Sequence, residues 1–190
     1  MTSSRFGAGT KLAACMALFG WLAVGTSFSR AQQRDERAVR AVRAAYVFNL
    51  TKYVEWPEAQ SEIIIGFVGD RSTGERLRDL LEGKTSGPRP IHVLLAPSEQ
   101  ELSRCTMLYL TEPLSARLRA TLDKPDNRNI LTVGEDDSFV KQHGMVGLVK
   151  VGDQIQIQVN LEETQRAGVH ISSRLLELAV IYKPAPGTKN

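Results

Sequence analysis

The sequence predicts an α/β fold: a single domain with a central, mostly parallel sheet, helices on both faces, and an antiparallel hairpin near the C-terminus. Apolar runs of strand length alternate four times with helical segments, which is typical of parallel sheets. These runs are almost continuously apolar, as expected of strands that are covered on both faces. Near the C-terminus, Gly152-Asp153 separates two strand-like segments in the manner of a hairpin turn.

Residues 1–31 have the pattern of a secretory signal peptide. Basic residues precede a short apolar run, Leu12–Gly25, and small residues at Ser29 and Ala31 place the predicted cleavage after Ala31. Export of the chain is therefore expected, and the alternative is that the segment stays uncleaved as a membrane anchor. A lipoprotein signal is rejected, because Cys15 stands before most of the apolar run rather than after it.

The exported chain is predicted to comprise one domain, residues 32–183, and a loose tail, residues 184–190. Of the 24 basic residues three lie in the leader, which leaves 21 against 21 acidic residues. This balance gives no support to nucleic-acid binding. Cleavage leaves Cys105 as the only cysteine, so the mature chain can form no internal disulfide. Burial of Cys105 at the start of a strand is predicted, and the alternative is a disulfide to a second copy, which would make a homodimer.

An amphipathic helix is predicted from Asp35 to Trp56, with Pro57 ending it. Its apolar side chains recur every three or four residues and form one face: Val39, Val42, Tyr46, Leu50 and Tyr53. Phe48 and Trp56 lie off this face. Either the helix is covered on both sides, or these two aromatic side chains contact something outside the chain, since aromatic residues are favoured anchors at protein interfaces.

The remaining elements follow from apolar runs and capping residues. The predicted strands are Ile63–Gly69, Ile91–Ala96, Thr106–Thr111, Asn129–Gly134 and a hairpin, Met145–Asn160. The predicted helices or turns are Gly69–Gly83, Ser98–Cys105, Pro113–Leu122, Glu135–Gly144, Leu161–Gly168 and Ile171–Tyr182. Ser72 and Glu75 have the spacing of a capping box, and the apolar stripe behind them is Leu77, Leu80 and Leu81.

The sequence contains no recognisable catalytic or metal-binding set. The turn Gly69–Gly74 between a strand and a helix matches no phosphate-binding motif and is interpreted as a well-capped turn. The acidic residues Glu135–Asp137 are interpreted as helix-start chemistry. The three histidines lack the spacing of metal ligands. The prediction is therefore a protein that is not an enzyme, with no cofactor and no metal.

Six segments, in order, resemble the YfiR family and together span about residues 38–181. They are AAYVFNLTKYVEWP, IIIGFVGDRSTGERL, GPRPIHVLL, CTMLYL, NILTVGEDDSFVKQHGMVGLV and IQIQVNLEETQRAGVHISSRLLELA. The resemblance implies a periplasmic α/β protein without enzymatic activity. The best-known member of that family is a repressor of an inner-membrane diguanylate cyclase. It binds the periplasmic part of the cyclase and lowers cyclic di-GMP synthesis, which controls biofilm formation and motility, and an outer-membrane lipoprotein relieves the repression.

Two features depart from the family pattern. The best-known member contains disulfides, which a chain with Cys105 alone cannot form internally. A glycine pair that is usual before the methionine-led strand is replaced here by His143-Gly144. Redox control through an internal disulfide is therefore not expected in this chain.

Two kinds of site are predicted. The first is a partner contact formed by Phe48, Lys52 and Trp56, which would bind the periplasmic domain of the cyclase. The alternative function is a periplasmic small-molecule sensor or binding protein with a different partner. Its cleft would lie at the carboxyl ends of the strands, near Asp70 and Asp136.

Overall fold

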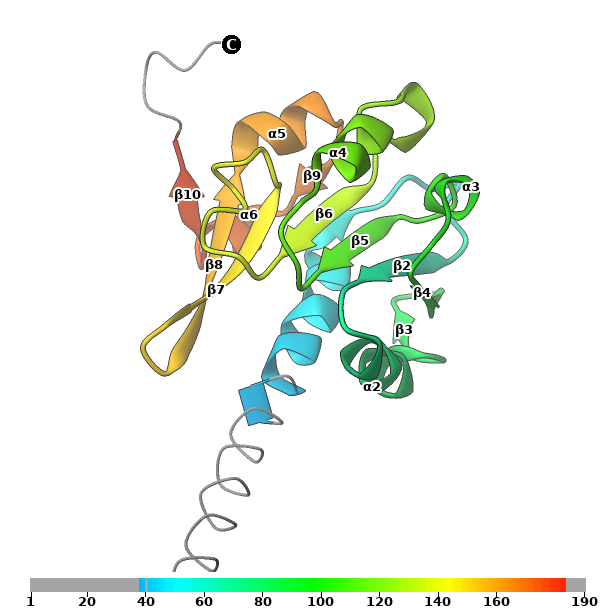
Figure 1. The fold of residues 1–190 in the computed structure, drawn as a ribbon, viewed down its shortest axis with the longest axis horizontal. Coiled ribbons are helices and arrows are strands. Elements are labelled where there is room, and N and C mark those ends of the chain that lie inside the picture. The colour runs from blue at the N-terminus through cyan, green and yellow to red at the C-terminus, as the bar shows by residue number, and fades with distance from the viewer. Residues whose placement is uncertain (1–37, 40, 184–190) are drawn as a thin grey trace, which may run out of the picture. The chain divides into compact units, whose positions relative to one another are not determined.

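Eight strands form one sheet in the computed structural model, which describes residues 38–39 and 41–183. The predicted leader, residues 32–37 and the tail 184–190 lie outside the described residues. The eight-stranded sheet belongs to a compact unit that begins at Val42. The strand order in the sheet is β10-β8-β7-β6-β5-β2-β4-β3 (Figure 1). The strands are β2 (Ile63–Val68), β3 (Thr85–Ser86), β4 (Arg89–Leu95), β5 (Met107–Leu110), β6 (Leu131–Gly134), β7 (Val146–Val151), β8 (Gln154–Asn160) and β10 (Val180–Tyr182).

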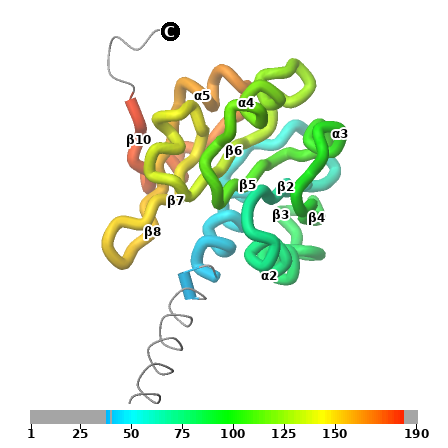
Figure 2. The backbone as a smooth tube through the Cα atoms, in the orientation of Figure 1, coloured from blue at the N-terminus to red at the C-terminus, as the bar shows by residue number. Residues whose placement is uncertain are grey.

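The sheet is parallel at its centre and mixed at its edges. Strands β4, β2, β5, β6 and β7 run parallel to one another. At the two sides of this group, β3 pairs antiparallel with β4, and β7 and β8 form the predicted antiparallel hairpin. Gly152 at the hairpin turn has φ +60°, a left-handed conformation that glycine adopts without strain. Figure 2 traces the chain through this hairpin to β10, which pairs parallel with β8 at one edge of the sheet. The predicted fold class is confirmed.

Helices cover both faces of the sheet. They are residues 41–53, α2 (Arg71–Leu81), α3 (Glu99–Leu102), α4 (Ala116–Leu122), η1 (Pro125–Asn127), α5 (Leu161–Arg166) and α6 (Ser173–Leu176). Alternate residues of β2 belong to two separate apolar clusters. Ile63, Ile65 and Phe67 pack with the helix of residues 41–53 and with α2, whereas Ile64 packs with α3 and α4 residues on the other face. This alternation explains why the strands are apolar throughout.

The first helix ends at Tyr53, three residues earlier than predicted, and its buried face differs in part from the predicted one. Residues 41–53 are helical, and β1 (Val54–Glu55) then pairs antiparallel with β9 (His170–Ile171). The buried side chains are Ala44, Val47, Leu50, Thr51 and Val54. Val42, which was expected in the core, is 46% exposed. The prediction was wrong for Val42, but Leu50 is buried as predicted, and Tyr46 and Tyr53 pack half-buried against the main cluster.

The segment after β9 was predicted to be helical up to Tyr182, and this prediction was wrong. Only Ser173–Leu176 is helical, and Val180–Tyr182 forms strand β10 along Gln158–Asn160 of β8. The β-branched pair Val180-Ile181 suits a strand, and the open edge of β8 supplies the hydrogen-bond partners. A local pattern of leucines predicted the helix, and tertiary pairing overrode it.

The starts of two helices also differ from the prediction. Asp70 rather than Ser72 caps α2, because an Asp70 carboxylate oxygen accepts a hydrogen bond from the backbone N–H of Thr73 at 2.9 Å. Ser115, two residues beyond Pro113, caps α4. Leu80, expected in the apolar stripe of α2, is 44% exposed. The capping box at Ser98 and Glu101 of α3 forms as the serine cap predicts.

Cys105 is buried, as predicted, and we expect its thiol to be unreactive in the folded protein. It is 5% exposed, and burial raises the pKa of the thiol to about 11, so the reactive thiolate is scarce below that pH. Alkylation at pH 8, followed by mass spectrometry of the Cys105 peptide, should show little labelling in buffer and full labelling in denaturant. Rapid labelling of the native protein would contradict the burial. The same burial argues against a disulfide between two copies.

The described residues contain no helix that is long and apolar enough to cross a membrane. Within the same part of the chain, no group of three or more His, Cys, Asp or Glu residues could hold a metal ion.

Candidate functional site

The predicted partner contact lies at the end of the first helix, and the structure adds a lysine to it. The ammonium nitrogen of Lys52 lies 4.2 Å from the centre of the Phe48 ring, and that of Lys84 lies 5.6 Å from it. Both distances are within the range of cation–π attraction. Lys84 comes from the turn between α2 and β3, a position that no local sequence pattern connects to the helix.

The two aromatic side chains of this contact are half-buried rather than fully exposed. Phe48 and Trp56 both pack against the main apolar cluster. The indole N–H of Trp56 donates a hydrogen bond to the carbonyl oxygen of Thr51 at 2.7 Å, which holds the ring against the end of the helix. The outer part of the contact is therefore cationic, because Lys52 and Lys84 are exposed above the Phe48 ring.

The helix that carries Phe48 is joined to the sheet by a partly buried polar cluster. A terminal guanidinium nitrogen of Arg43 lies 2.6 Å from a carboxylate oxygen of Glu135, directly after β6. The hydroxyl of Tyr109, near the end of β5, donates a hydrogen bond to the other oxygen of Glu135. Burial first, and the Glu135 carboxylate second, raise the pKa of Tyr109. The sequence indicated only an acidic run at Glu135, because nothing local identified Arg43 and Tyr109 as its partners.

Asp70 and Asp136 each have a local structural role. Asp70 caps α2, and hydrogen bonds from the Ser72 hydroxyl and from Thr73 lower its pKa to about 2. Asp136 accepts hydrogen bonds from the backbone N–H and the hydroxyl of Ser138, which lower the pKa of its carboxyl group. Neither residue lines the two cavities described next. A ligand site at these carboxylates stays a prediction, and the structure does not join them in a shared cavity.

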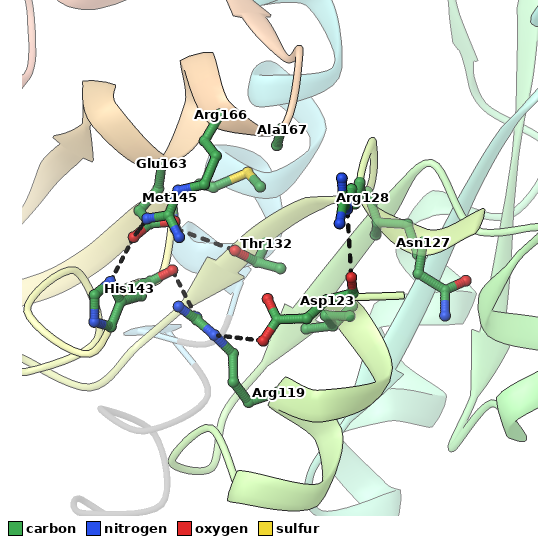
Figure 3. Close-up of a pocket in the computed structure, with 12 residues that line it drawn as sticks. Arg119, Asp123, Asn127, Arg128, Thr132, His143, Met145, Glu163, Arg166 and Ala167 are labelled. Carbon is green, nitrogen blue, oxygen red and sulfur yellow. Dashed lines mark hydrogen bonds and ion pairs between the residues drawn. The ribbon is translucent and has the colours of Figure 1, made fainter. Parts of the chain in front are cut away.

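A polar cavity of about 370 Å³ lies near the amino ends of β6 and β7 (Figure 3). Asp70 and Asp136, in contrast, follow the carboxyl ends of their strands. Residues from α4, η1, α5 and the loop before β7 line it. Glu163 of α5 is 7% exposed, and its carboxylate pairs with both Arg166 and the ring of His143, whose Nδ1 is 2.5 Å away. A buried carboxylate needs such partners, because an unpaired buried charge is costly.

His143 is in an unusual backbone conformation inside this cavity. Its φ is +67°, a left-handed conformation that costs a non-glycine residue about 1 kcal/mol. Two contacts hold it: the ring pairs with Glu163, and its carbonyl oxygen accepts a hydrogen bond from the Arg119 guanidinium at 2.9 Å (Figure 3). The glycine that the family pattern favours at this position would adopt this φ without strain. The departure at His143-Gly144 was visible in the sequence, but it gave no indication of a cavity.

Arg119 and Arg128 line the other side of the cavity. The Nε atom of Arg119 lies 3.7 Å from the Asp123 carboxylate, and the Nε–H of Arg128 donates a hydrogen bond to the Asp123 carbonyl oxygen at 3.3 Å. The terminal nitrogens of Arg128 make no hydrogen bond or ion pair to another described residue. Apolar side chains complete the lining: Leu122, Ile130, Met145 and Ala167. The arrangement can bind an anion beside an apolar wall.

A second cavity, of about 400 Å³, lies between Tyr46 of the first helix and the β7–β8 hairpin. Its lining includes Ile155, Ile157 and Leu178, and Leu178 is 70% exposed. The cavity contains no charged side chain among its lining residues, so it offers shape and apolar contact rather than ionic recognition.

Comparison with known proteins gives one family match. A family model described as YfiR/HmsC-like matches residues 40–180 of this chain. No curated protein matches the sequence. Among solved structures, the crystal structure of an ABC domain from Streptococcus pneumonia in complex with L-Trp is similar, with 10% sequence identity and a TM-score of 0.47. The similarity covers 70% of this chain and 58% of that chain, so this chain spans less than two thirds of its length.

Proposed function

This chain belongs to the YfiR/HmsC-like family, and we propose from that membership that it is a periplasmic repressor of a membrane diguanylate cyclase. The family match over residues 40–180 is the observation that carries the proposal. The family is regulatory and not catalytic. The repressor would bind the periplasmic domain of the cyclase, lower cyclic di-GMP synthesis, and so control biofilm formation and motility.

The proposed mechanism is a shift between two states of the cyclase. A periplasmic protein can inhibit a cytoplasmic active site only if it binds the inactive state of the receptor more tightly than the active state. An outer-membrane lipoprotein that competes for the repressor would release the cyclase. The leader pattern of residues 1–31 supports a periplasmic location for this exchange.

The contact surface in this proposal is formed by Phe48, Lys52, Lys84 and Trp56. The half-buried aromatic rings are rigid because they pack against the core, so little entropy is lost when a partner covers them. The two ammonium groups above Phe48 favour a partner surface that combines acidic and apolar side chains. The Arg43–Glu135 ion pair fixes the helix that presents these residues.

Reversing both charges should abolish tight binding to the cyclase. The Lys52→Glu, Lys84→Glu variant is expected to bind the purified periplasmic domain of the matching cyclase at least about tenfold more weakly, because like charges would then face each other. Both side chains are exposed, so the fold should be retained. Phe48→Ala with Trp56→Ala tests the aromatic rings, but it also removes core contacts.

A matched control separates local contact from overall charge. Lys150→Glu makes the same kind of change on the exposed end of β7, away from the proposed surface, and should bind like the unaltered protein. If the double variant keeps full affinity, the assigned surface is wrong. If the unaltered protein binds none of the periplasmic sensor domains of the host's diguanylate cyclases, the cyclase partner is wrong.

A further inference from the structure

We propose that the cavity between α4, η1 and α5 binds a small aliphatic monocarboxylate. The cavity measures about 370 Å³, which is within the range of small-molecule sites. It lies at the amino ends of β6 and β7, whereas the proposed partner surface is formed by the first helix and the turn before β3. The proposal therefore concerns a different part of the molecule and does not rest on the cyclase as partner.

The charge of the lining favours an anion. Three arginines, Arg119, Arg128 and Arg166, face two carboxylates, Asp123 and Glu163, so one positive charge is in surplus even with His143 neutral. Arg166 is paired with Glu163, and Arg119 lies beside Asp123. The surplus is therefore located at Arg128, whose terminal nitrogens have no partner among the described residues. A guanidinium with both terminal nitrogens available suits a two-point contact with a carboxylate.

The acids in the lining restrict the ligand to a single negative charge. The Glu163 carboxylate is buried and the Asp123 carboxylate also lines the cavity, so a second anionic group on the ligand would be repelled by both. Dicarboxylates and phosphate dianions are disfavoured for this reason. A monocarboxylate head at Arg128 would leave the pairs around Glu163 undisturbed.

The apolar part of the lining favours an aliphatic body. Leu122, Ile130 and Met145 are flexible or branched aliphatic side chains, and no Phe, Tyr or Trp lines the cavity. An aromatic ligand would find no benzene or indole ring to stack on, whereas an alkyl chain of a few carbons can pack against these three residues. Hexanoate has both features, a single carboxylate and a short alkyl chain.

Binding of hexanoate can be measured on the exported protein by titration in ¹H–¹⁵N spectra. We expect saturable shifts of amides that line the cavity, with a dissociation constant in the low-millimolar range or below, as befits so small a ligand. Arg128→Gln should weaken binding at least about tenfold, because one charge-assisted contact is lost. Arg117→Gln on the neighbouring helix α4 is the control, since Arg117 is 88% exposed, pairs with Glu99 and does not line the cavity.

Two further probes separate the contributions of the carboxylate and of the alkyl chain to binding. 1-Hexanol keeps the alkyl chain without the charge, and inorganic phosphate keeps the charge without the chain; both should bind at least about tenfold more weakly than hexanoate. Phosphate binding as tight as hexanoate would identify a general anion site and overturn the proposal. Equal binding of 1-hexanol, equal losses in Arg117→Gln and Arg128→Gln, or no saturable hexanoate binding would overturn it as well.

Discussion

Replacing Phe139 by alanine should lower the free energy of unfolding by about 3–5 kcal/mol, the range for removal of a buried phenylalanine ring. Phe139 is 1% exposed and belongs to the apolar cluster under α3 and α4. Its ring lies against two glycines: a Cβ built on Gly134 would come within 2.4 Å of the ring, and one on Gly144 within 2.2 Å. The neighbouring backbone cannot easily fill the space that the ring leaves, so most of the cavity should persist.

Urea denaturation of the variant would measure this loss. Leu178→Ala is a suitable control, because Leu178 is 70% exposed and its truncation should change stability by less than about 0.5 kcal/mol. The converse variant, Gly144→Ala, should also destabilise the protein, since the new methyl group would overlap the ring of Phe139. A Phe139→Ala protein as stable as the control would show that the ring is not packed as the structure describes.

Replacing Arg43 by methionine should lower the free energy of unfolding by about 2–3 kcal/mol. Methionine keeps much of the apolar stem but removes the charge beside Glu135, whose side chain is 14% exposed. Breaking a fully buried ion pair costs about 3–5 kcal/mol, and the partial exposure of this pair reduces the expected loss. Tyr109 would still donate its hydrogen bond to Glu135.

A double-mutant cycle isolates the Arg43–Glu135 interaction. In the Arg43→Met, Glu135→Gln double variant the carboxylate charge is absent, so its stability should exceed that expected from adding the two single losses. Chemical denaturation of the four proteins at pH 7 gives the coupling free energy, expected at about 1–2 kcal/mol. If the two single losses of unfolding free energy add exactly in the double variant, the ion pair does not stabilise the packing of the helix.

The central part of the fold was predictable because its signals are local. The runs that become β2, β5 and β6 are apolar except at Thr132, and the sheet buries them on both faces. The β7–β8 hairpin was predictable for the same reason, since the turn residues and the alternation on β8 are adjacent in sequence.

The elements that were missed depend on residues far apart in the chain. Val54–Glu55 becomes a strand only because His170–Ile171 lies beside it, and Val180–Tyr182 does so only because β8 offers an edge. The strand propensity of a short segment does not indicate which distant segment will pair with it.

The sites show the same division between local and distant signals. Asp70 and Asp136 were noticed because acidic residues after a strand are a local pattern, and both proved to have local hydrogen-bonding roles. Arg43 meets Glu135, and Lys84 meets Phe48, only in the folded chain. The arginines of the cavity also come from separate helices, α4 and α5, and from the residue after η1. Spacing in the sequence gave no indication of these groupings.

The pairing of β1 with β9 has a consequence for the export that is proposed above for this chain. Val54 pairs with Ile171, and the Ser172 N–H donates a hydrogen bond to the Tyr53 carbonyl oxygen, so two segments more than a hundred residues apart must meet. Such distant contacts form slowly, because the entropy of closing a long loop is lost before they contribute. In a chain exported N-terminus first, this pairing would therefore form only after His170–Ile171 had crossed the membrane. A chain that ended before His170 would lack the partner strand of β1.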